Sequence, residues 1–119
     1  MRQTVTLTTT GRRSGAARPV TLYAFDDDDR LVVVGSQGGK PADPAWVGNL
    51  RATPRATVRI AKGADRAIVA HEVLDGERDR LWAMVVEAFP LYATYQRRTS
   101  RTIPLFVLEP AAGDQGGRP

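Results

Sequence analysis

The chain has 119 residues, of which 42% are hydrophobic and 25% charged, and its formal net charge is +4. This length and apolar content are typical of one small globular domain. The sequence contains no cysteine, which excludes disulfides, thiolate nucleophiles and cysteine-ligated metals. It shows neither a secretory leader nor an apolar run long enough to cross a bilayer, so we expect a cytoplasmic protein without stable membrane insertion.

The positive charge is compatible with nucleic acid or with a small anionic ligand. Nucleic-acid-binding surfaces usually interleave basic residues with aromatic ones on which bases can stack, and this sequence does not. We therefore expect a small-molecule substrate and no nucleic-acid partner.

The first predicted strand, residues 5–10, leads into a loop that combines glycine with arginine. Its sequence is Gly11-Arg12-Arg13-Ser14-Gly15, and Arg18 follows shortly after. Glycine permits positive φ, consecutive backbone N–H groups can form an anion-binding nest, and arginine adds a planar, charged fork. The loop therefore indicates an anion site, although a plain hairpin turn with solvated arginines is the alternative when the loop is taken alone.

The next two predicted strands, residues 18–25 and 31–35, are separated by four aspartates at 26–29. We interpret the aspartates as a hairpin turn with carboxylates in water, because they lack the spacing of metal ligands. Residues 31–35 are apolar enough for a central strand. His71 is the only histidine and has no acid partner at a useful spacing, so we expect a surface or barrel-wall residue and no metal site.

Asp43 and Pro44 form a helix start signal, because aspartate is a good N-cap and proline is tolerated in the first turn. The predicted helix covers residues 44–52. Trp46, Asn49 and Leu50 fall on one face of it. A helix N-terminus also favours anions, so this helix start could face a ligand.

The rest of the chain predicts strands over 56–61 and 67–74, a helix over 75–89, a short helix over 91–97 and a last strand over 103–108. The apolar stripe of the long helix consists of Leu81, Trp82, Val85, Ala88 and Phe89. Six strands with two or three short helices indicate a mainly β (α+β) fold, a closed or nearly closed antiparallel barrel without exposed edges. We expect one domain over residues 1–110 and a flexible tail over 111–119.

Three segments carry a family resemblance: residues 8–15 with Arg18, residues 36–50, and residues 92–95 with 101–105. In order and spacing they resemble the deazaflavin-dependent nitroreductase family of actinobacteria, oxidoreductases that use coenzyme F420. The resemblance runs from about residue 6 to residue 110. It implies a six-stranded antiparallel split β-barrel and reduced F420 (F420H2) as the cofactor.

The resemblance also implies where the cofactor binds. Its phosphate and anionic tail would meet Arg12, Arg13, Ser14 and Arg18, and its head group or linker would lie under residues 36–39. Gln37 stands where many relatives have lysine, which removes one positive charge. The full set of residues implied to bind the cofactor is Gly11, Arg12, Arg13, Ser14, Gly15, Arg18, Thr21, Tyr23, Ser36, Gln37, Gly38, Gly39, Ala45, Trp46 and Asn49.

Two members of that set have simpler readings. A single tryptophan on a helix face, such as Trp46, is more often a core residue than a ligand wall. Asn49 could be an ordinary exposed polar residue.

The resemblance makes Tyr92 and Tyr95 the catalytic candidates, because matching tyrosines line the family's substrate pocket. A phenol with a pKa of about 10 stays protonated at neutral pH and can donate a proton to a developing anion. Packing of the helix against the barrel is the alternative, and it is favoured for Tyr95. Phe89 occupies a position that is often tyrosine in relatives.

We therefore predict an F420H2-dependent reductase that transfers a hydride to an electron-poor planar substrate: an activated C=C bond, a quinone or a nitroaromatic. The alternatives are a deazaflavin carrier without turnover and an FMN-binding split-barrel oxidoreductase. Both a monomer and a homodimer are compatible with the sequence.

Overall fold

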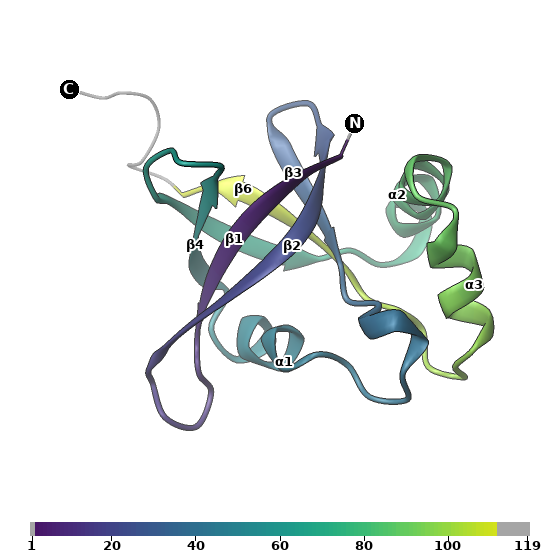
Figure 1. Cartoon of the computed structure of the whole chain (residues 1–119), viewed down its shortest axis with the longest axis horizontal. Helices are drawn as coiled ribbons and strands as arrows, with labels where there is room; N and C mark the ends of the chain where they lie inside the picture. Colours follow the sequence, from purple (N-terminus) through teal and green to yellow (C-terminus); the bar gives the residue numbers. More distant parts are fainter. Residues whose placement is uncertain (1, 112–119) are drawn as a thin grey trace.

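The computed structural model describes residues 2–111 and shows a closed antiparallel barrel (Figure 1). Its strands are β1 (Arg2–Thr10), β2 (Ala17–Asp27), β3 (Arg30–Val34), β4 (Arg55–Ile60), β5 (Arg66–Glu72) and β6 (Leu105–Pro110). They pair in the order β1-β2-β3-β6-β5-β4, and β4 closes the barrel against β1. The predicted six-stranded antiparallel barrel is confirmed.

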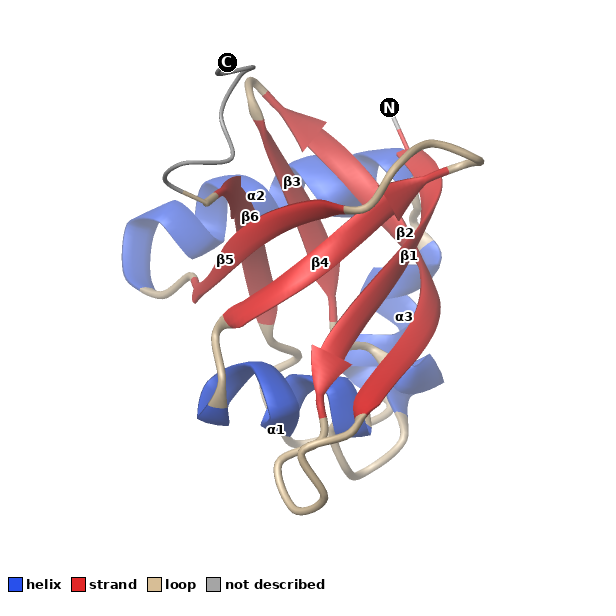
Figure 2. Ribbon diagram, turned by 90° about the vertical axis from the view of Figure 1, so that its left-hand side faces the viewer, coloured by secondary structure: helices blue, strands red, loops and turns tan. Residues whose placement is uncertain are grey.

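Three α-helices and one 3₁₀ turn accompany the barrel: η1 (Gln37–Gly39), α1 (Ala45–Ala52), α2 (Asp75–Ala88) and α3 (Leu91–Arg97). Helices α2 and α3 lie on one flank of the barrel, whereas α1 lies across one end, beside the β1–β2 loop (Figures 1 and 2). Among the described residues no helix is both long and apolar enough to span a membrane.

Two hydrophobic clusters hold the helices to the barrel. The inner cluster fills the barrel and includes Trp46, Val47 and Leu50 from α1, which therefore plugs that end. The outer cluster lies between the barrel wall and the α2–α3 flank and includes Leu81, Val85 and Tyr92.

Strands β3 and β6 contribute to both clusters. In β6, Phe106 and Leu108 belong to the inner cluster, whereas Leu105 and Val107 belong to the outer one. Successive side chains of a strand point to opposite faces, so a strand covered on both faces reads as a continuous apolar run. This explains why residues 31–35 had the composition of a central strand.

The last strand begins two residues later than predicted. Ile103 is fully buried, but its backbone N–H donates to Gln96 Oε1 and its carbonyl accepts from Arg78, so it does not join the sheet. At the other end, Ala111 is 3% exposed and its N–H donates to the carbonyl of Ala67. Ala111, which we had assigned to the tail, is therefore part of the folded structure. Residues 112–119 lie outside the described residues.

The prediction for Asp43 is wrong, and the solvated turn predicted for residues 26–29 is confirmed only for Asp28 and Asp29, which are exposed in the β2–β3 turn. Pro44, not Asp43, is the N-cap of α1, and no side chain caps that helix. The Asp43 carboxylate instead pairs with Arg51 and Arg101. Asp27 belongs to β2 rather than to a solvated turn, and its carboxylate pairs with Arg30 and Arg80.

The apolar stripe of α2 is shorter at the C-terminal end of the helix than predicted. Leu81 and Val85 are buried as the apolar stripe requires, and Trp82 and Phe89 are partly buried. Ala88 is exposed, because the helix ends there and the chain turns towards α3.

Candidate functional site

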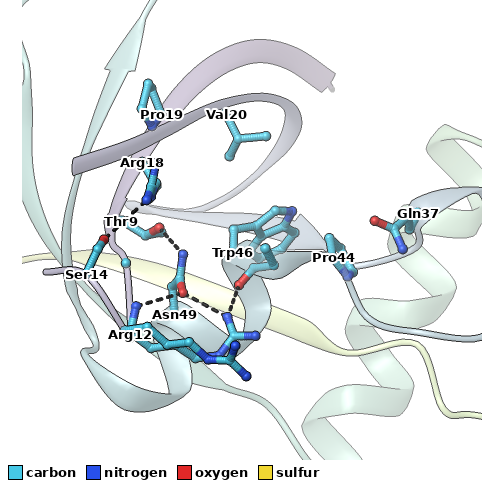
Figure 3. Close-up of a pocket in the computed structure, with 13 residues that line it drawn as sticks. Thr9, Arg12, Ser14, Arg18, Pro19, Val20, Gln37, Pro44, Trp46 and Asn49 are labelled. Carbon is cyan, nitrogen blue, oxygen red and sulfur yellow. Dashed lines mark hydrogen bonds between the residues drawn. The ribbon is translucent and has the colours of Figure 1, made fainter. Parts of the chain in front are cut away.

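A cavity of about 530 Å³ opens at the end of the barrel that α1 covers (Figure 3). The β1–β2 loop forms one wall and α1 with the preceding turn forms another. The cavity is lined by Thr9, Gly11, Arg12, Arg13, Ser14, Arg18, Pro19, Val20, Gln37, Pro44, Ala45, Trp46 and Asn49. The structure thus brings together the first loop and the α1 helix, which are more than 25 residues apart in the sequence.

The β1–β2 loop is held by its own backbone. The N–H of Gly11 donates to the carbonyl of Ala16, and the N–H of Gly15 donates to that of Gly11, each at 2.8 Å. Gly15 has a φ of +73°, which favours glycine. The N–H of Ala16 donates to Ser14 Oγ. The backbone nest that we predicted is therefore mostly engaged inside the protein, and the arginine side chains are what this loop offers to an anion.

Asn49 joins the loop to α1 and is 4% exposed. Its Oδ1 accepts from the backbone N–H of Arg12 at 3.1 Å and from Arg12 Nη1 at 3.0 Å (Figure 3). Its Nδ2 donates to Oγ1 of Thr9, which is 1% exposed. The reading of Asn49 as an exposed polar residue is wrong, because its amide has a partner on each side.

Arg12 lies against α1. Nη1 also donates to the carbonyl of Ala45, and a Cβ at Gly48 would lie only 3.0 Å from the Arg12 guanidinium. The missing side chain of Gly48 therefore lets Arg12 pack on the helix. Arg12 holds the loop to the helix with part of its guanidinium, and the rest faces the cavity.

Arg13 and Arg18 provide the more available charge. The Arg13 guanidinium has no hydrogen bond or ion pair within residues 2–111, whereas Arg18 Nη2 donates to Ser14 Oγ at 3.2 Å. Among residues 2–111, no carboxylate lines the cavity. Three arginines without a counter-charge in one concave surface make a region of positive potential, because field lines are focused there.

The wall from α1 is apolar. Trp46 is 6% exposed, and its ring packs on Phe106 with the centroids 5.9 Å apart. Trp46 is thus a core residue, and together with Pro44 and Ala45 it also lines the cavity.

The second predicted loop, residues 36–39, joins the cavity to α3. Gln37, Gly38 and Gly39 have φ values of +44°, +65° and +82°. Gln37 lines the cavity, and its Nε2 donates to the carbonyl of Ala42. Gly39 is buried against α3, where a Cβ would lie 2.7 Å from the carbonyl oxygen of Tyr95. Glycine is therefore required at position 39 for close packing as well as for its backbone angles.

Arg101 holds this loop, a role that sequence reasoning missed. Its guanidinium donates to the carbonyls of Gly35, Ser36 and Lys40 and to Asp43 Oδ1, at 2.6–3.2 Å. Arg101 lay inside a segment that carried the family resemblance, but no spacing rule predicts a partner some 60 residues away.

The aromatic candidates lie on the α2–α3 flank, outside the lining of the cavity. Tyr92 is 5% exposed and makes edge-to-face contacts with Phe89, Phe25 and Tyr95, with centroids 4.8, 5.9 and 6.3 Å apart. Its hydroxyl has no hydrogen-bond partner within residues 2–111, where every fully buried side-chain polar atom does have one. The ring is therefore packed in the outer cluster, while the hydroxyl retains contact with solvent.

Burial is the main cause that raises the pKa of Tyr92 to about 12; the nearby Tyr23 and Tyr95 contribute in the same direction and Arg2 opposes them. The phenol therefore stays protonated throughout the neutral range. It can donate a proton or a hydrogen bond but cannot act as a base there.

Thr21 and Tyr23 lie on the outer face of β2, between the cavity and the aromatic side chains. Tyr23 is 39% exposed, and its ring centroid lies 5.6 Å from that of Phe89. The Arg2 guanidinium carbon lies over the Tyr23 ring, 4.6 Å from its centroid. The sequence-predicted residues that do not line the cavity are Gly15, Thr21, Tyr23, Ser36, Gly38, Gly39, Tyr92 and Tyr95. Thr9, Pro19, Val20 and Pro44 line it without having been predicted, although each directly neighbours a predicted segment.

His71 has an acid neighbour that the sequence did not reveal. Its Nε2 lies 3.4 Å from Glu109 Oε1, because β5 pairs with β6. Both side chains are about half exposed, and within residues 2–111 no group of three potential metal ligands exists.

Comparison with known proteins identifies the family. The family model for F420H(2)-dependent quinone reductases matches residues 1–110. An F420H(2)-dependent quinone reductase of Mycobacterium tuberculosis is 40% identical over 106 residues, which cover 86% of this chain and 70% of that protein.

Solved structures agree with the assignment. The structure of an F420-H2 dependent reductase superposes with a TM-score of 0.77 at 38% identity, covering 89% of this chain and 93% of that one. Another, described as a domain-swapped dimer, gives a TM-score of 0.76 at 38% identity and covers 89% of this chain and 79% of that one.

The fold and the comparisons define a barrel oxidoreductase that depends on a deazaflavin. The chain belongs to the F420H(2)-dependent quinone reductase family, and its cofactor is reduced coenzyme F420.

Proposed function

We propose that this protein reduces quinones with F420H2 and that the cavity beside α1 binds the anionic part of the cofactor. The observation that carries the proposal is the lining of that cavity, which contains Arg12, Arg13 and Arg18 and no carboxylate. The F420 tail carries a phosphodiester and glutamates, so it is a polyanion that fits this donor set.

In this proposal Arg13 and Arg18 bind the anionic tail. Arg12 holds the loop against α1 through Asn49, so Arg13 and Arg18 need little reorganisation when they meet the ligand. Trp46 and Pro44 provide an apolar wall that excludes water from one side of the cofactor. Gln37, Gly38 and Gly39 border the head group or its linker.

When bound, the reduced cofactor supplies a hydride. Reduction of a quinone to a hydroquinone takes one hydride and one proton. Tyr92 carries a proton at neutral pH, because its pKa is raised to about 12, and its hydroxyl is the proton donor in this proposal. Tyr23, Phe89 and Tyr95 offer ring surfaces that suit a planar substrate.

The first test is a fluorescence titration of the purified protein with oxidised F420 and, separately, with FMN. We expect saturable micromolar binding of F420 and weak or absent binding of FMN. Reduced F420 should then be oxidised when a naphthoquinone is added, and not in its absence. Tight FMN binding without F420 binding would contradict the proposed site.

The role of Tyr92 is tested with Tyr92→Phe, which keeps the packed ring and removes the donor. We expect quinone turnover to fall on the order of 100-fold with little change in F420 affinity, since general acid catalysis contributes about that much. The wild-type rate should show no ionisation of Tyr92 below about pH 10. Tyr95→Phe should have a smaller effect. Equal quinone turnover in wild type and Tyr92→Phe would assign Tyr92 a packing role only.

Three further proposals concern the domain boundary, the cellular compartment and the oligomeric state. We propose one functional domain over residues 1–110, the span of the family match, and a cytoplasmic enzyme. A homodimer is favoured over a monomer because a relative of 38% identity is a domain-swapped dimer. Light scattering after size exclusion would give the mass directly.

A further inference from the structure

The loop between β3 and α1 has a backbone that needs external support. Three successive residues, Gln37 to Gly39, have positive φ, and this conformation is strained for the non-glycine Gln37. Within the loop only two backbone hydrogen bonds form, from the N–H of Gly39 to Ser36 and from that of Lys40 to Gln37. Such a conformation persists when the surrounding structure over-determines it.

Arg101 supplies that support from outside the loop. Nη1 and Nη2 bind the carbonyls of Gly35 and Ser36, before the turn, and Nε binds the carbonyl of Lys40, after it. Nη1 also reaches Asp43 Oδ1 at 2.6 Å, in front of α1. One planar side chain, 15% exposed, thereby fastens both ends of the turn and the start of the helix.

The fastened loop touches both halves of the proposed site. Gln37 lines the cavity, whereas Gly39 packs directly on the Tyr95 carbonyl of α3. A shift of the loop would therefore change the cavity wall and the position of α3 together.

We infer that Arg101 is a positioning residue that sets the loop of residues 35–43 against the cofactor cavity and aligns that cavity with α3. Arg101 does not line the cavity, so it acts through the loop. The inference rests on the proposed function, because the loop matters only if the cavity holds F420. Lysine cannot replace arginine here, since an ammonium group cannot reach carbonyls on both sides of the turn at once.

The test uses Arg101→Gln and Arg101→Lys in the full chain, with Arg59→Gln as the matched control. Arg59 is an exposed arginine of β4 whose single partner among the described residues is Asp65. Amide hydrogen exchange of residues 35–43 is measured in each protein beside F420 affinity, kcat and KM for a naphthoquinone.

In both Arg101 variants we expect the amide hydrogens of residues 35–43 to exchange faster than in the wild type. The amide hydrogens of the barrel strands should remain protected from exchange. The F420 dissociation constant should rise about tenfold, which is about 1.4 kcal/mol. The quinone kcat should fall as well, because α3 loses its alignment. Arg59→Gln should match the wild type in all four quantities: exchange, F420 affinity, kcat and KM.

Three results would overturn the inference. Unchanged exchange in residues 35–43 would show that Arg101 does not hold the loop. Wild-type F420 affinity in Arg101→Lys would show that charge alone matters. Loss of protection throughout the barrel in both variants would make Arg101 a general stabiliser. If the wild-type protein itself failed to bind F420, the proposed function would fail instead, and the exchange data would still report on the loop.

Discussion

The two ends of the barrel carry cavities of similar size and opposite character. The first, beside α1, has about 530 Å³ and three arginines on its lining. The second, at the other end of the β1–β2 hairpin, has about 490 Å³ and is lined by Asp26, Asp28 and Asp29 together with Arg30 and Arg66. The two cavities therefore differ in the sign of their lining charge and not in their volume.

The difference arises from the turns that close each end. At the first end the β1–β2 loop presents arginines whose charge the protein does not neutralise. At the second end Arg30 pairs with Asp27 and Glu77, so its charge is compensated. A polyanion is attracted to the first end and repelled by the aspartates of the second. This difference in charge supports the first end as the proposed binding site of the cofactor.

The largest expected effect is the loss of that polarity. In Arg13→Glu/Arg18→Glu the two more available positive charges become negative. Because each charge-assisted hydrogen bond contributes about 1.5–3 kcal/mol, F420 affinity should fall at least ~100-fold. The measurement is the fluorescence titration with F420, repeated at two salt concentrations, since the wild-type affinity should weaken with salt.

Arg66→Glu is the matched control at the opposite end, because Arg66 lines the second cavity and is exposed. It should bind F420 with wild-type affinity. Equal losses at both ends would mean that overall charge, and not the first cavity, governs binding.

The next effect concerns Asn49, whose hydrogen bonds join the β1–β2 loop to α1 beside the first cavity. Asn49→Ala leaves Thr9, the Arg12 backbone N–H and one Arg12 side-chain donor without their partner. An unsatisfied buried group costs about 1–3 kcal/mol, so we expect the free energy of unfolding to fall by about 2–3 kcal/mol. Urea denaturation measures this, and F420 affinity should fall as well, because the loop loses its anchor on α1.

Asn49→Asp separates the two roles of this side chain. The carboxylate retains the acceptor for Arg12 and loses the donor to Thr9, whose own hydroxyl can reverse and donate. The loss of stability should therefore be smaller than in Asn49→Ala. If both variants were as stable as the wild type, the hydrogen bonds of Asn49 would not hold this end together.

Local patterns were sufficient for the elements but not for the contacts between them. The alternation of apolar and polar residues, together with glycine and proline positions, predicted the bounds of all six strands and of the helices to within a few residues. These signals depend only on neighbours in the chain. The β1–β2 loop was predicted to be an anion site from its own glycines and arginines, and those arginines line the first cavity. Its backbone nest was overestimated, since the partner of the Arg12 N–H is Asn49, which lies 37 residues away.

The residues that the sequence analysis missed act over long separations. Arg101 meets carbonyls more than 60 residues away, and Asp43 serves that arginine instead of capping α1. Neither Arg101 nor Asp43 lies in a local sequence motif that indicates these contacts. Side-chain hydrogen bonds to distant carbonyls depend on tertiary packing, so no pattern in one sequence encodes them.

The smallest expected effect concerns Asp27, at the end of the barrel that carries the second cavity. It should leave F420 binding at the first cavity unchanged. Hydrogen bonds from Arg80 and then from Arg30 lower the pKa of Asp27 below its usual value of 3.8, against the opposing effect of burial. Because the folded-state pKa is the lower one, the ion pairs stabilise the protein above about pH 4, and this stabilisation is lost as the pH falls through the folded-state pKa. Asp27→Asn removes it at every pH. The variant should therefore be less stable than the wild type by about 1 kcal/mol near neutral pH, and the difference should shrink towards zero as the pH falls below the folded-state pKa of Asp27.

Urea denaturation of wild type and Asp27→Asn across this range measures the difference, and the F420 titration near neutral pH provides the comparison with the other end. Unchanged F420 affinity together with a pH-dependent loss of stability is the expected result. A stability difference that stayed constant with pH would show that Asp27 acts through packing, not charge. A loss of F420 affinity would show that the two ends are coupled through the shared β1–β2 hairpin, and the charge of each end could then no longer be treated separately.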